Sequence, residues 1–232
     1  GNDTSFRQTG TINIATTKSR YQEYLRQKTM SKLFDLNIEL IDKKRFKNLY
    51  PIAKNKDVYG GLFIPDDGQA DPEILTKNIS IAAKQKGVKI FEKCKLEKIL
   101  KRGNQIRGVK TNLGTINCEY IVLCAGMWSR QIGEAAGVSI PLYPNEHFYM
   151  ITQDYKNLPK ALPTFRDPDT YLYAREYHGK MMLGIFEPNA KNAFKKTSKV
   201  PNNFSFGEFK VDKKYIKMLH QLAAKRIPTI KH

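Results

Sequence analysis

One histidine and two tyrosines are the side chains of this sequence best suited to exchanging a proton with a bound molecule. His147 lies in the aromatic, apolar segment NEHFYMIT, and Tyr171 and Tyr173 alternate with a leucine in TYLYARE. Histidine titrates near neutral pH, and a phenol hydroxyl both donates and accepts hydrogen bonds. The alternation predicts that the two tyrosines share one face of a strand. On the residues alone, ordinary strand aromatics explain both segments, because a lone histidine on such a strand is more often structural than catalytic.

Motifs for other kinds of chemistry are absent from the sequence. It contains no G-x-G-x-x-G and no P-loop, so the usual means of holding a dinucleotide is missing. It also contains no G-x-S-x-G and no H-E-x-x-H motif. The sequence has three cysteines, Cys94, Cys118 and Cys124, and they form no C-x-x-C pair, so we predict no metal site. We expect all three to be small core residues of a protein in a reducing compartment.

The charge balance is strongly basic, with a formal net charge of +18 over 232 residues. Lysines supply most of the positive charge and are spread along the chain, without zinc-finger spacing or an RNA-binding aromatic box. We therefore predict no nucleic-acid partner, although a basic binding module stays open as an alternative. No run of 18 apolar residues occurs, so we predict no membrane insertion. A cationic surface would also steer a carboxylate substrate toward the protein.

The elements that must position these side chains follow from hydrophobic periodicity. A helix is clearest in DPEILTKNISIAAKQKG, where Asp71 can cap the first turn and Gly87 suits the end. Alternating residues from Val88 onward predict an antiparallel meander with turns at Gly103 and near Gly114. We expect further strands in GTINIATT, NIELI, YGGLFIP, EHFYMIT, TYLYARE and MMLGIFE, and further helices in KSRYQEYLRQKTMSKLF and VDKKYIKMLHQLAAKRIP.

The segment EYIVLCAGMWSRQIGEAAG predicts a strand that leads directly into a helix. Tyr120 to Cys124 carry no charge and are followed by Ala125 and Gly126, which is typical of a buried parallel strand in an α/β sheet. The small residues at the junction would let a ligand approach the backbone. Because this α/β element stands between two strand-rich parts, we expect two interleaved domains of class α/β plus β.

Five segments, in order, resemble the FAD-dependent amine oxidoreductases of the D-amino-acid oxidase superfamily. They are RQTGTINIATT, GGLFIPDDGQADP, YIVLCAGMWSRQIGEAAGVSIPLYPNEHFYMIT, LPTFRDPDTYLYARE and LGIFEPNAK. The sequence is most similar to the dimethylglycine dehydrogenase and sarcosine dehydrogenase branch. This resemblance implies a partial FAD-binding (glutathione-reductase-like) domain interleaved with a mixed β-sheet substrate domain. The implied parts are substrate domain 1–70, FAD domain 71–138, substrate domain 139–210, and a helix 211–232 that stops before the final FAD-binding segment.

The resemblance also implies roles for individual residues. It implies that His147 and Tyr173 are catalytic residues and that Arg175 and Tyr149 bind the substrate. We expect the strands of His147 and Tyr173 to be neighbours in one sheet. The resemblance further implies that FAD would contact four positions: Leu96, Ala125, Gly126 and Trp128.

The implied activity is hydride transfer to FAD from an N-methylated glycine-type amine, such as dimethylglycine or sarcosine. The substrate would be a small methylated amino acid, and the setting a bacterial cytoplasm or the mitochondrial matrix. The family's N-terminal glycine fingerprint and its folate domain do not occur here, so we expect a fragment whose partner is the remaining polypeptide. Tetrahydrofolate would bind only through that other domain. Alone, the chain should be inactive and bind flavin poorly. A non-catalytic regulatory relative of the same family stays open as an alternative.

Overall fold

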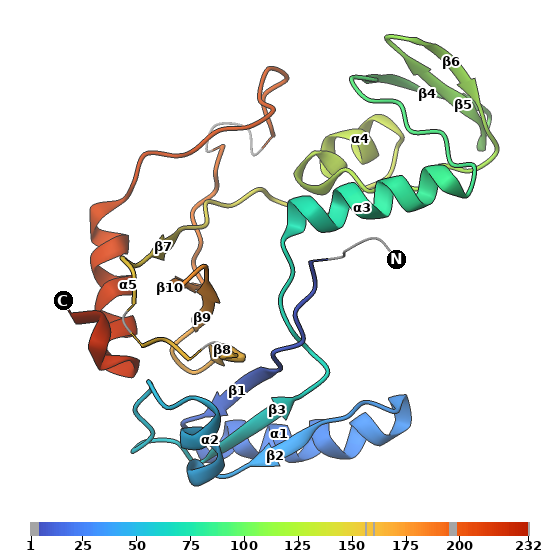
Figure 1. Cartoon of the computed structure of the whole chain (residues 1–232). Helices are drawn as coiled ribbons and strands as arrows, with labels where there is room; N and C mark the ends of the chain where they lie inside the picture. Colours follow the sequence, from blue (N-terminus) through green and yellow to red (C-terminus); the bar gives the residue numbers. More distant parts are fainter. Residues whose placement is uncertain (1–4, 156, 160, 195–198, 232) are drawn as a thin grey trace. The chain divides into compact units, whose positions relative to one another are not determined.

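The computed structural model describes residues 1–232 except 1–4, 156, 160, 195–198 and 232 (Figure 1). Its contacts divide the chain into two units. The sheet unit comprises Gly1–Ala82, His147–Pro188 and Lys210–His232, and the meander unit comprises Ala83–Glu146 and Asn189–Phe209. Among the described residues, no helix is long and apolar enough to cross a membrane.

A seven-stranded mixed sheet forms the centre of the sheet unit, in the order β2-β3-β1-β8-β9-β10-β7. Only β1 and β8 pair in parallel, and the other neighbours are antiparallel. The pairing of β1 with β8 joins the N-terminal part of the chain to its later part. The strands are β1 Thr11–Ala15, β2 Glu39–Ile41, β3 Gly60–Ile64, β7 Tyr149–Ile151, β8 Thr164–Asp167, β9 Leu172–Tyr177 and β10 Lys180–Ile185.

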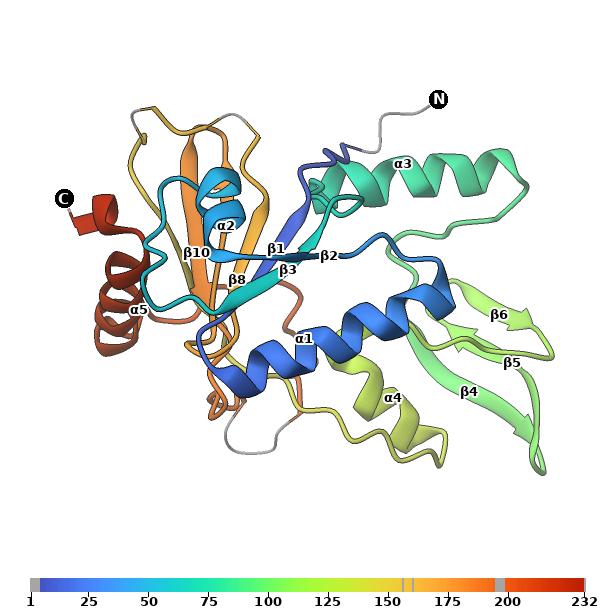
Figure 2. The ribbon, with the colours of Figure 1, turned by 90° about the horizontal axis from the view of Figure 1, so that it is seen from below.

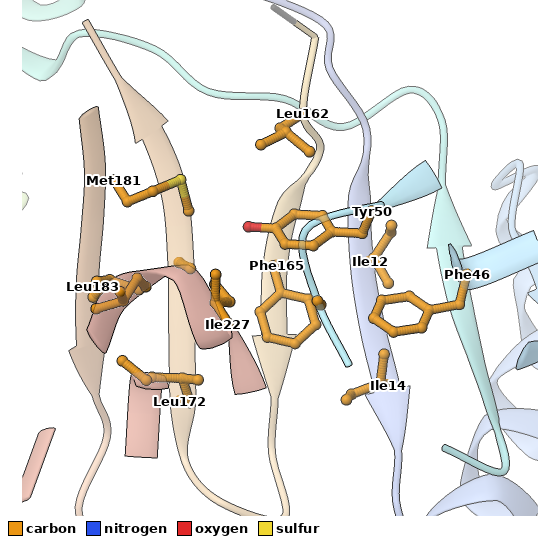
Figure 3. Close-up of a cluster of buried hydrophobic side chains, with 14 of the residues drawn as sticks. Ile12, Ile14, Phe46, Tyr50, Leu162, Phe165, Leu172, Met181, Leu183 and Ile227 are labelled. Atoms are coloured by element: carbon orange, nitrogen blue, oxygen red, sulfur yellow. The ribbon is translucent and has the colours of Figure 1, made fainter. Parts of the chain in front are cut away.

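One face of this sheet carries the main hydrophobic core. Helices α2 (Lys43–Leu49) and α5 (Lys213–Arg226) pack there, and η3 (Pro228–Lys231) follows α5. Figure 3 shows Phe46 and Tyr50 beside Phe165, with ring centroids of Tyr50 and Phe165 4.9 Å apart. Residues at alternate positions supply the strand side of this core, which is why the strand sequences alternate. The strand residues are Ile12, Ile14, Ile41, Phe63, Phe165, Leu172, Ala174, Met181, Leu183 and Ile185.

The opposite face, called the second face here, is covered at one end by α1 (Lys18–Ser31) (Figure 2). Tyr24 packs there with Leu62 in a smaller core cluster, while the adjacent Phe63 points into the main core. Side chains of β7, β9 and β10 on the second face are exposed or half-buried, namely Tyr149, Ile151, Tyr173, Arg175, Tyr177 and Met182. This part of the sheet is therefore accessible to a small molecule.

The meander unit contains a separate three-stranded antiparallel sheet of β4 (Leu96–Arg102), β5 (Gln105–Thr111) and β6 (Gly114–Asn117). A short 3₁₀ turn η2 (Gly126–Trp128) runs directly into α4 (Ser129–Ala135). Helix α3 (Pro72–Gln85) reaches from the sheet unit to the start of the meander unit. The meander expected from the alternating sequence is confirmed from Leu96 onward, with its turns at Gly103 and Gly114, whereas residues 88–95 form no strand.

The predicted buried strand at Tyr120 to Cys124 is wrong. These residues form no ladder in the structure, and Tyr120 and Val122 are each 85% exposed. A parallel strand needs neighbours that accept and donate its backbone hydrogen bonds, and no described strand pairs with this segment. Its apolar composition alone therefore does not produce a strand, although the helix predicted after it is present.

Three smaller expectations also differ from the structure. Tyr171 precedes β9 in a left-handed conformation with φ of 61°, so it does not continue the face of Tyr173. Strand β8 was not expected from the sequence. None of the cysteines is a core residue: Cys94 and Cys118 are half-buried and Cys124 is exposed, and all three are free thiols.

Candidate active site

A single row of residues crosses the second face of the sheet. Cross-strand pairing joins Asn13 of β1 to Arg166 of β8, then Arg166 to Tyr173 of β9. Tyr173 pairs in turn with Gly184 of β10, which pairs with Tyr149 of β7. Residues directly opposite in a sheet present their side chains on the same face. The row therefore brings an amide, a guanidinium and two phenols from four different strands onto one surface.

Gly184 decides where the ring of Tyr173 lies. A Cβ at this position would sit 2.6 Å from Cε1 of Tyr173 and closer still to its Cζ and hydroxyl. The ring thus crosses directly over the backbone of β10, which only a residue without a side chain permits. The hydroxyl of Tyr173 reaches Nε2 of His147, which precedes β7, at 2.8 Å. The prediction that the strands of His147 and Tyr173 are neighbours is therefore wrong. Strand β10 lies between β9 and β7.

Phe186 completes an aromatic cluster around this hydrogen bond. Its ring centroid is 5.2 Å from that of His147 and 4.8 Å from that of Tyr173. The guanidinium of Arg166 lies over the ring of Phe186, 5.3 Å from its centroid. Aromatic faces attract cations, so Phe186 connects the histidine–tyrosine pair to a positive charge.

Burial raises the pKa of Tyr173, and the neighbouring Tyr149 and Glu187 raise it further, while Arg175 lowers it. The phenol is therefore protonated at neutral pH and has a proton to share with His147. Because the hydrogen bond joins a phenol to an imidazole nitrogen, either group can carry the proton between them, depending on the histidine tautomer. The pair can accept a hydrogen bond from an amine or donate one to it.

A cleft of about 610 Å³ is lined by Tyr149, Arg175 and Tyr177 of the second face together with the segment 69–74, and neither His147 nor Tyr173 belongs to its lining. The guanidinium of Arg175 lies 3.4 Å from Sδ of Met182 and 3.3 Å from the side-chain amide of Gln69. It also lies 5.1 Å from the centroid of the Tyr177 ring. Arg175 is thus packed against the cleft wall by its neighbours.

A buried carboxylate supports the same wall. Glu176 is 8% exposed, and its carboxylate accepts hydrogen bonds from Arg7 at 2.7 Å and from the N–H of Gly179 at 2.8 Å. Burial opposes ionisation, but the Gly179 and Arg7 hydrogen bonds outweigh it and lower the pKa of Glu176. This ion pair ties the N-terminal segment to β9, next to Arg175.

A second cleft, of about 830 Å³, lies within the meander unit. Its lining includes all four residues that the sequence suggested for cofactor contact: Leu96, Ala125, Gly126 and Trp128. At Gly126 the backbone has φ of 51°, and a Cβ there would meet no protein atom within 4 Å. The backbone of Gly126 is therefore exposed to the cleft, and apolar side chains such as Ile132 lie beside it in the lining.

Sequence reasoning found only part of the arrangement on the second face. The structure brings His147 and Tyr173 into contact and places Tyr149 and Arg175 in the lining of the 610 Å³ cleft. Three residues were missed: Gly184, Phe186 and Arg166. An isolated glycine inside the apolar strand MMLGIFE was an available signal, because such a glycine often marks a close approach.

Comparison with known proteins gives a consistent family. Residues 1–232 match the family model DAO, described as FAD dependent oxidoreductase. The chain is 32% identical over 209 residues to 4-methylaminobutanoate oxidase (formaldehyde-forming) of Paenarthrobacter nicotinovorans, covering 90% of this chain and 25% of that protein. It is 29% identical over 235 residues to mitochondrial sarcosine dehydrogenase of Mus musculus, covering 99% and 25%.

A third relative has a different kind of name. The mitochondrial pyruvate dehydrogenase phosphatase regulatory subunit of Mus musculus is 32% identical over 197 residues, covering 84% of this chain and 22% of that protein. The chain thus spans about a quarter of the length of these curated relatives. Among solved structures, L-proline dehydrogenase from P. horikoshii superposes with a TM-score of 0.83 at 25% identity, covering 98% of this chain and 58% of that one.

Proposed function

This chain belongs to the DAO family of FAD-dependent oxidoreductases, and from that premise we propose that the full-length protein oxidises an N-methylated amino acid. Sarcosine, dimethylglycine and 4-methylaminobutanoate define the substrate class, because relatives named for such amines match nearly the whole chain. The observation that carries the proposal is the hydrogen bond between His147 and Tyr173 on the accessible second face of the sheet.

The meander-unit cleft supports FAD as the cofactor. Leu96 and Trp128 offer apolar walls for a flat aromatic group. Because Gly126 has no side chain, a flavin could approach its backbone closely. These residues, with Ala125, would hold the flavin. When bound, FAD supplies the two-electron acceptor for amine oxidation.

The residues of the second face would prepare the amine. A secondary or tertiary amine must lose its proton at nitrogen before a hydride can leave the adjacent carbon. His147 and Tyr173 can accept that proton or hold the neutral amine by a hydrogen bond, at an imidazole nitrogen and a phenol oxygen 2.8 Å apart. Phe186 would help to hold both rings in place, because it stacks on His147 and packs at a tilt against Tyr173.

The test is anaerobic mixing of the full-length protein with sarcosine, dimethylglycine and 4-methylaminobutanoate while flavin absorbance is followed. At least one of these should bleach the flavin, and formaldehyde should appear on turnover with an electron acceptor. Glycine, which has no N-methyl group to lose, is the control that should give no formaldehyde. If none of the methylated amines reduces the flavin, the proposed oxidation is wrong.

A non-catalytic regulatory role is the second candidate, favoured by the 32% identity to a subunit named as regulatory. Under this alternative the flavin would not be reduced by any amine, so the same experiment separates the two candidates. The compartment we propose is the bacterial cytoplasm or the mitochondrial matrix, since the relatives come from a bacterium and from mitochondria. Transfer of the one-carbon unit to tetrahydrofolate would require the part of the protein beyond this chain.

A further inference from the structure

We propose that Arg166 binds the carboxylate of the substrate and so fixes which way the amine points. The inference rests on the proposed function for the identity of the substrate, but its geometric basis is independent. The family resemblance implies a binding role for Arg175 but none for Arg166.

Arg166 lies in the same cross-strand row as Tyr173 and faces it directly across the β8–β9 ladder. Its neighbours Phe165 and Asp167 point into the main core, so the arginine side chain projects from the second face. The guanidinium lies 5.3 Å from the centroid of Phe186, whose ring also contacts His147 and Tyr173. Through the ring of Phe186, a positive charge therefore lies near the proton-exchanging pair.

The guanidinium of Arg166 has no carboxylate partner in the part of the chain that the structure describes. The arginines that do form ion pairs there, such as Arg7, Arg20 and Arg226, have a carboxylate oxygen within 3.2 Å. Arg166 is also exposed, so its N–H groups are available to a ligand from solvent. A fork of N–H donors that is held on an aromatic ring and lacks an anion is well suited to a bidentate carboxylate.

Arg175 is less suited to the same task. Its guanidinium is in contact with Met182, Gln69 and the ring of Tyr177, and these contacts hold it against the cleft wall. A carboxylate bound there would have to displace those contacts. Among the described residues, the guanidinium of Arg166 contacts one aromatic ring, that of Phe186, which leaves its edge free to bind a carboxylate.

This arrangement predicts which ligands the site would distinguish. An amino acid presents one amine and one carboxylate, and contact with Arg166 would direct the carboxylate to β8 while the amine meets His147 and Tyr173. An analogue with an uncharged carboxamide in place of the carboxylate would lose the first contact and keep the second. Discrimination between a carboxylate and its amide should therefore depend on Arg166.

The experiment measures binding by saturation-transfer NMR on the full-length protein, with acetate, sarcosine and sarcosine amide, which has an uncharged carboxamide in place of the carboxylate, as probes. Arg166→Ala should weaken binding of acetate and sarcosine by about 10- to 100-fold, as expected for loss of a hydrogen-bonded charge, and leave the amide unchanged. Arg166→Lys keeps the charge without the planar fork and should lose several-fold. Arg26→Ala, an exposed arginine on α1, is the matched control and should bind like the parent.

The inference is overturned if Arg166→Ala and Arg166→Lys bind both carboxylates as the parent does, if Arg175→Ala causes the loss instead, or if the parent binds no carboxylate. If Arg166→Ala does not fold, the ratio of carboxylate binding to amide binding in Arg166→Lys tests the inference in its place. If the carboxylates bind through Arg166 but no methylated amine reduces the flavin, the proposed oxidation fails while the carboxylate site stands.

Discussion

Replacing Gly184 with alanine tests the arrangement on which the candidate site depends. The added methyl group would lie 2.6 Å from Cε1 of Tyr173, whereas ordinary carbon contacts begin near 3.4 Å. The tyrosine ring would have to move away by about 1 Å or more, and its hydroxyl would then leave His147. The backbone of Gly184 is not left-handed, so the effect comes from the side-chain contact and not from backbone strain.

Overpacking of this kind usually costs about 1–3 kcal/mol of unfolding free energy, and we expect the lower half of that range because Tyr173 is only half-buried. The effect on chemistry should be larger than the effect on stability. A displacement of about 1 Å in a positioned group can slow a reaction by about 10²-fold. Flavin reduction by the methylated amine should therefore slow by that order while the protein stays folded.

The assays are urea unfolding and anaerobic stopped-flow reduction of the flavin in the full-length protein. The matched control places Gly184→Ala in a Tyr173→Ala background, where no ring remains to clash and the methyl group should cost nothing. An equal loss of stability in both backgrounds would show that the methyl group clashes with something other than Tyr173. Unchanged stability and rate in the single variant would mean that the ring does not lie over β10.

Four other substitutions test the same structure. His147→Gln and Tyr173→Phe should each slow flavin reduction by about 10²-fold with little loss of folding, since each keeps most of its packing; parent rates with an unchanged pH profile would make both residues structural. Arg226→Ala should lower the unfolding free energy by about 3–5 kcal/mol, because it leaves the carboxylate of the fully buried Asp167 without its 2.9 Å partner, and chemical denaturation measures the loss. Because the pKa of Glu176 is lowered on folding, its contribution to stability is present above its unfolded pKa of about 4.3 and is lost as pH falls through the folded pKa. Glu176→Gln should thus flatten the decline in stability on acidification, and a decline as steep as the parent's in urea titrations would contradict this.

The sequence by itself determined the elements whose signals are local. Helix α3 begins where Asp71 was expected to cap it, and the carboxylate accepts hydrogen bonds from the N–H groups of Glu73 and Ile74 at 2.9 and 3.0 Å. Strand β1 and helix α5 were likewise evident from periodicity, since alternation and amphipathicity lie within a few consecutive residues. The family was also evident, because its motifs are short segments that keep their order along the chain.

Composition failed where an element depends on partners. The segment Tyr120 to Cys124 has the residues of a buried strand, but strand formation requires neighbouring backbones, and the described residues provide none. Strand β8 shows the reverse case. Its sequence TFRD is a weak strand signal, yet pairing with β1 on one side and β9 on the other makes it the centre of the sheet.

Only the tertiary structure decided how the candidate site is assembled. His147 and Tyr173 were suggested by resemblance, but their contact depends on Gly184, which lies on a strand between them. Arg166 faces Tyr173 because β8 and β9 pair in one particular register, and a shift of one residue would turn it into the core. Register is set by contacts between residues far apart in the sequence, and no local pattern records which side chains it will place together.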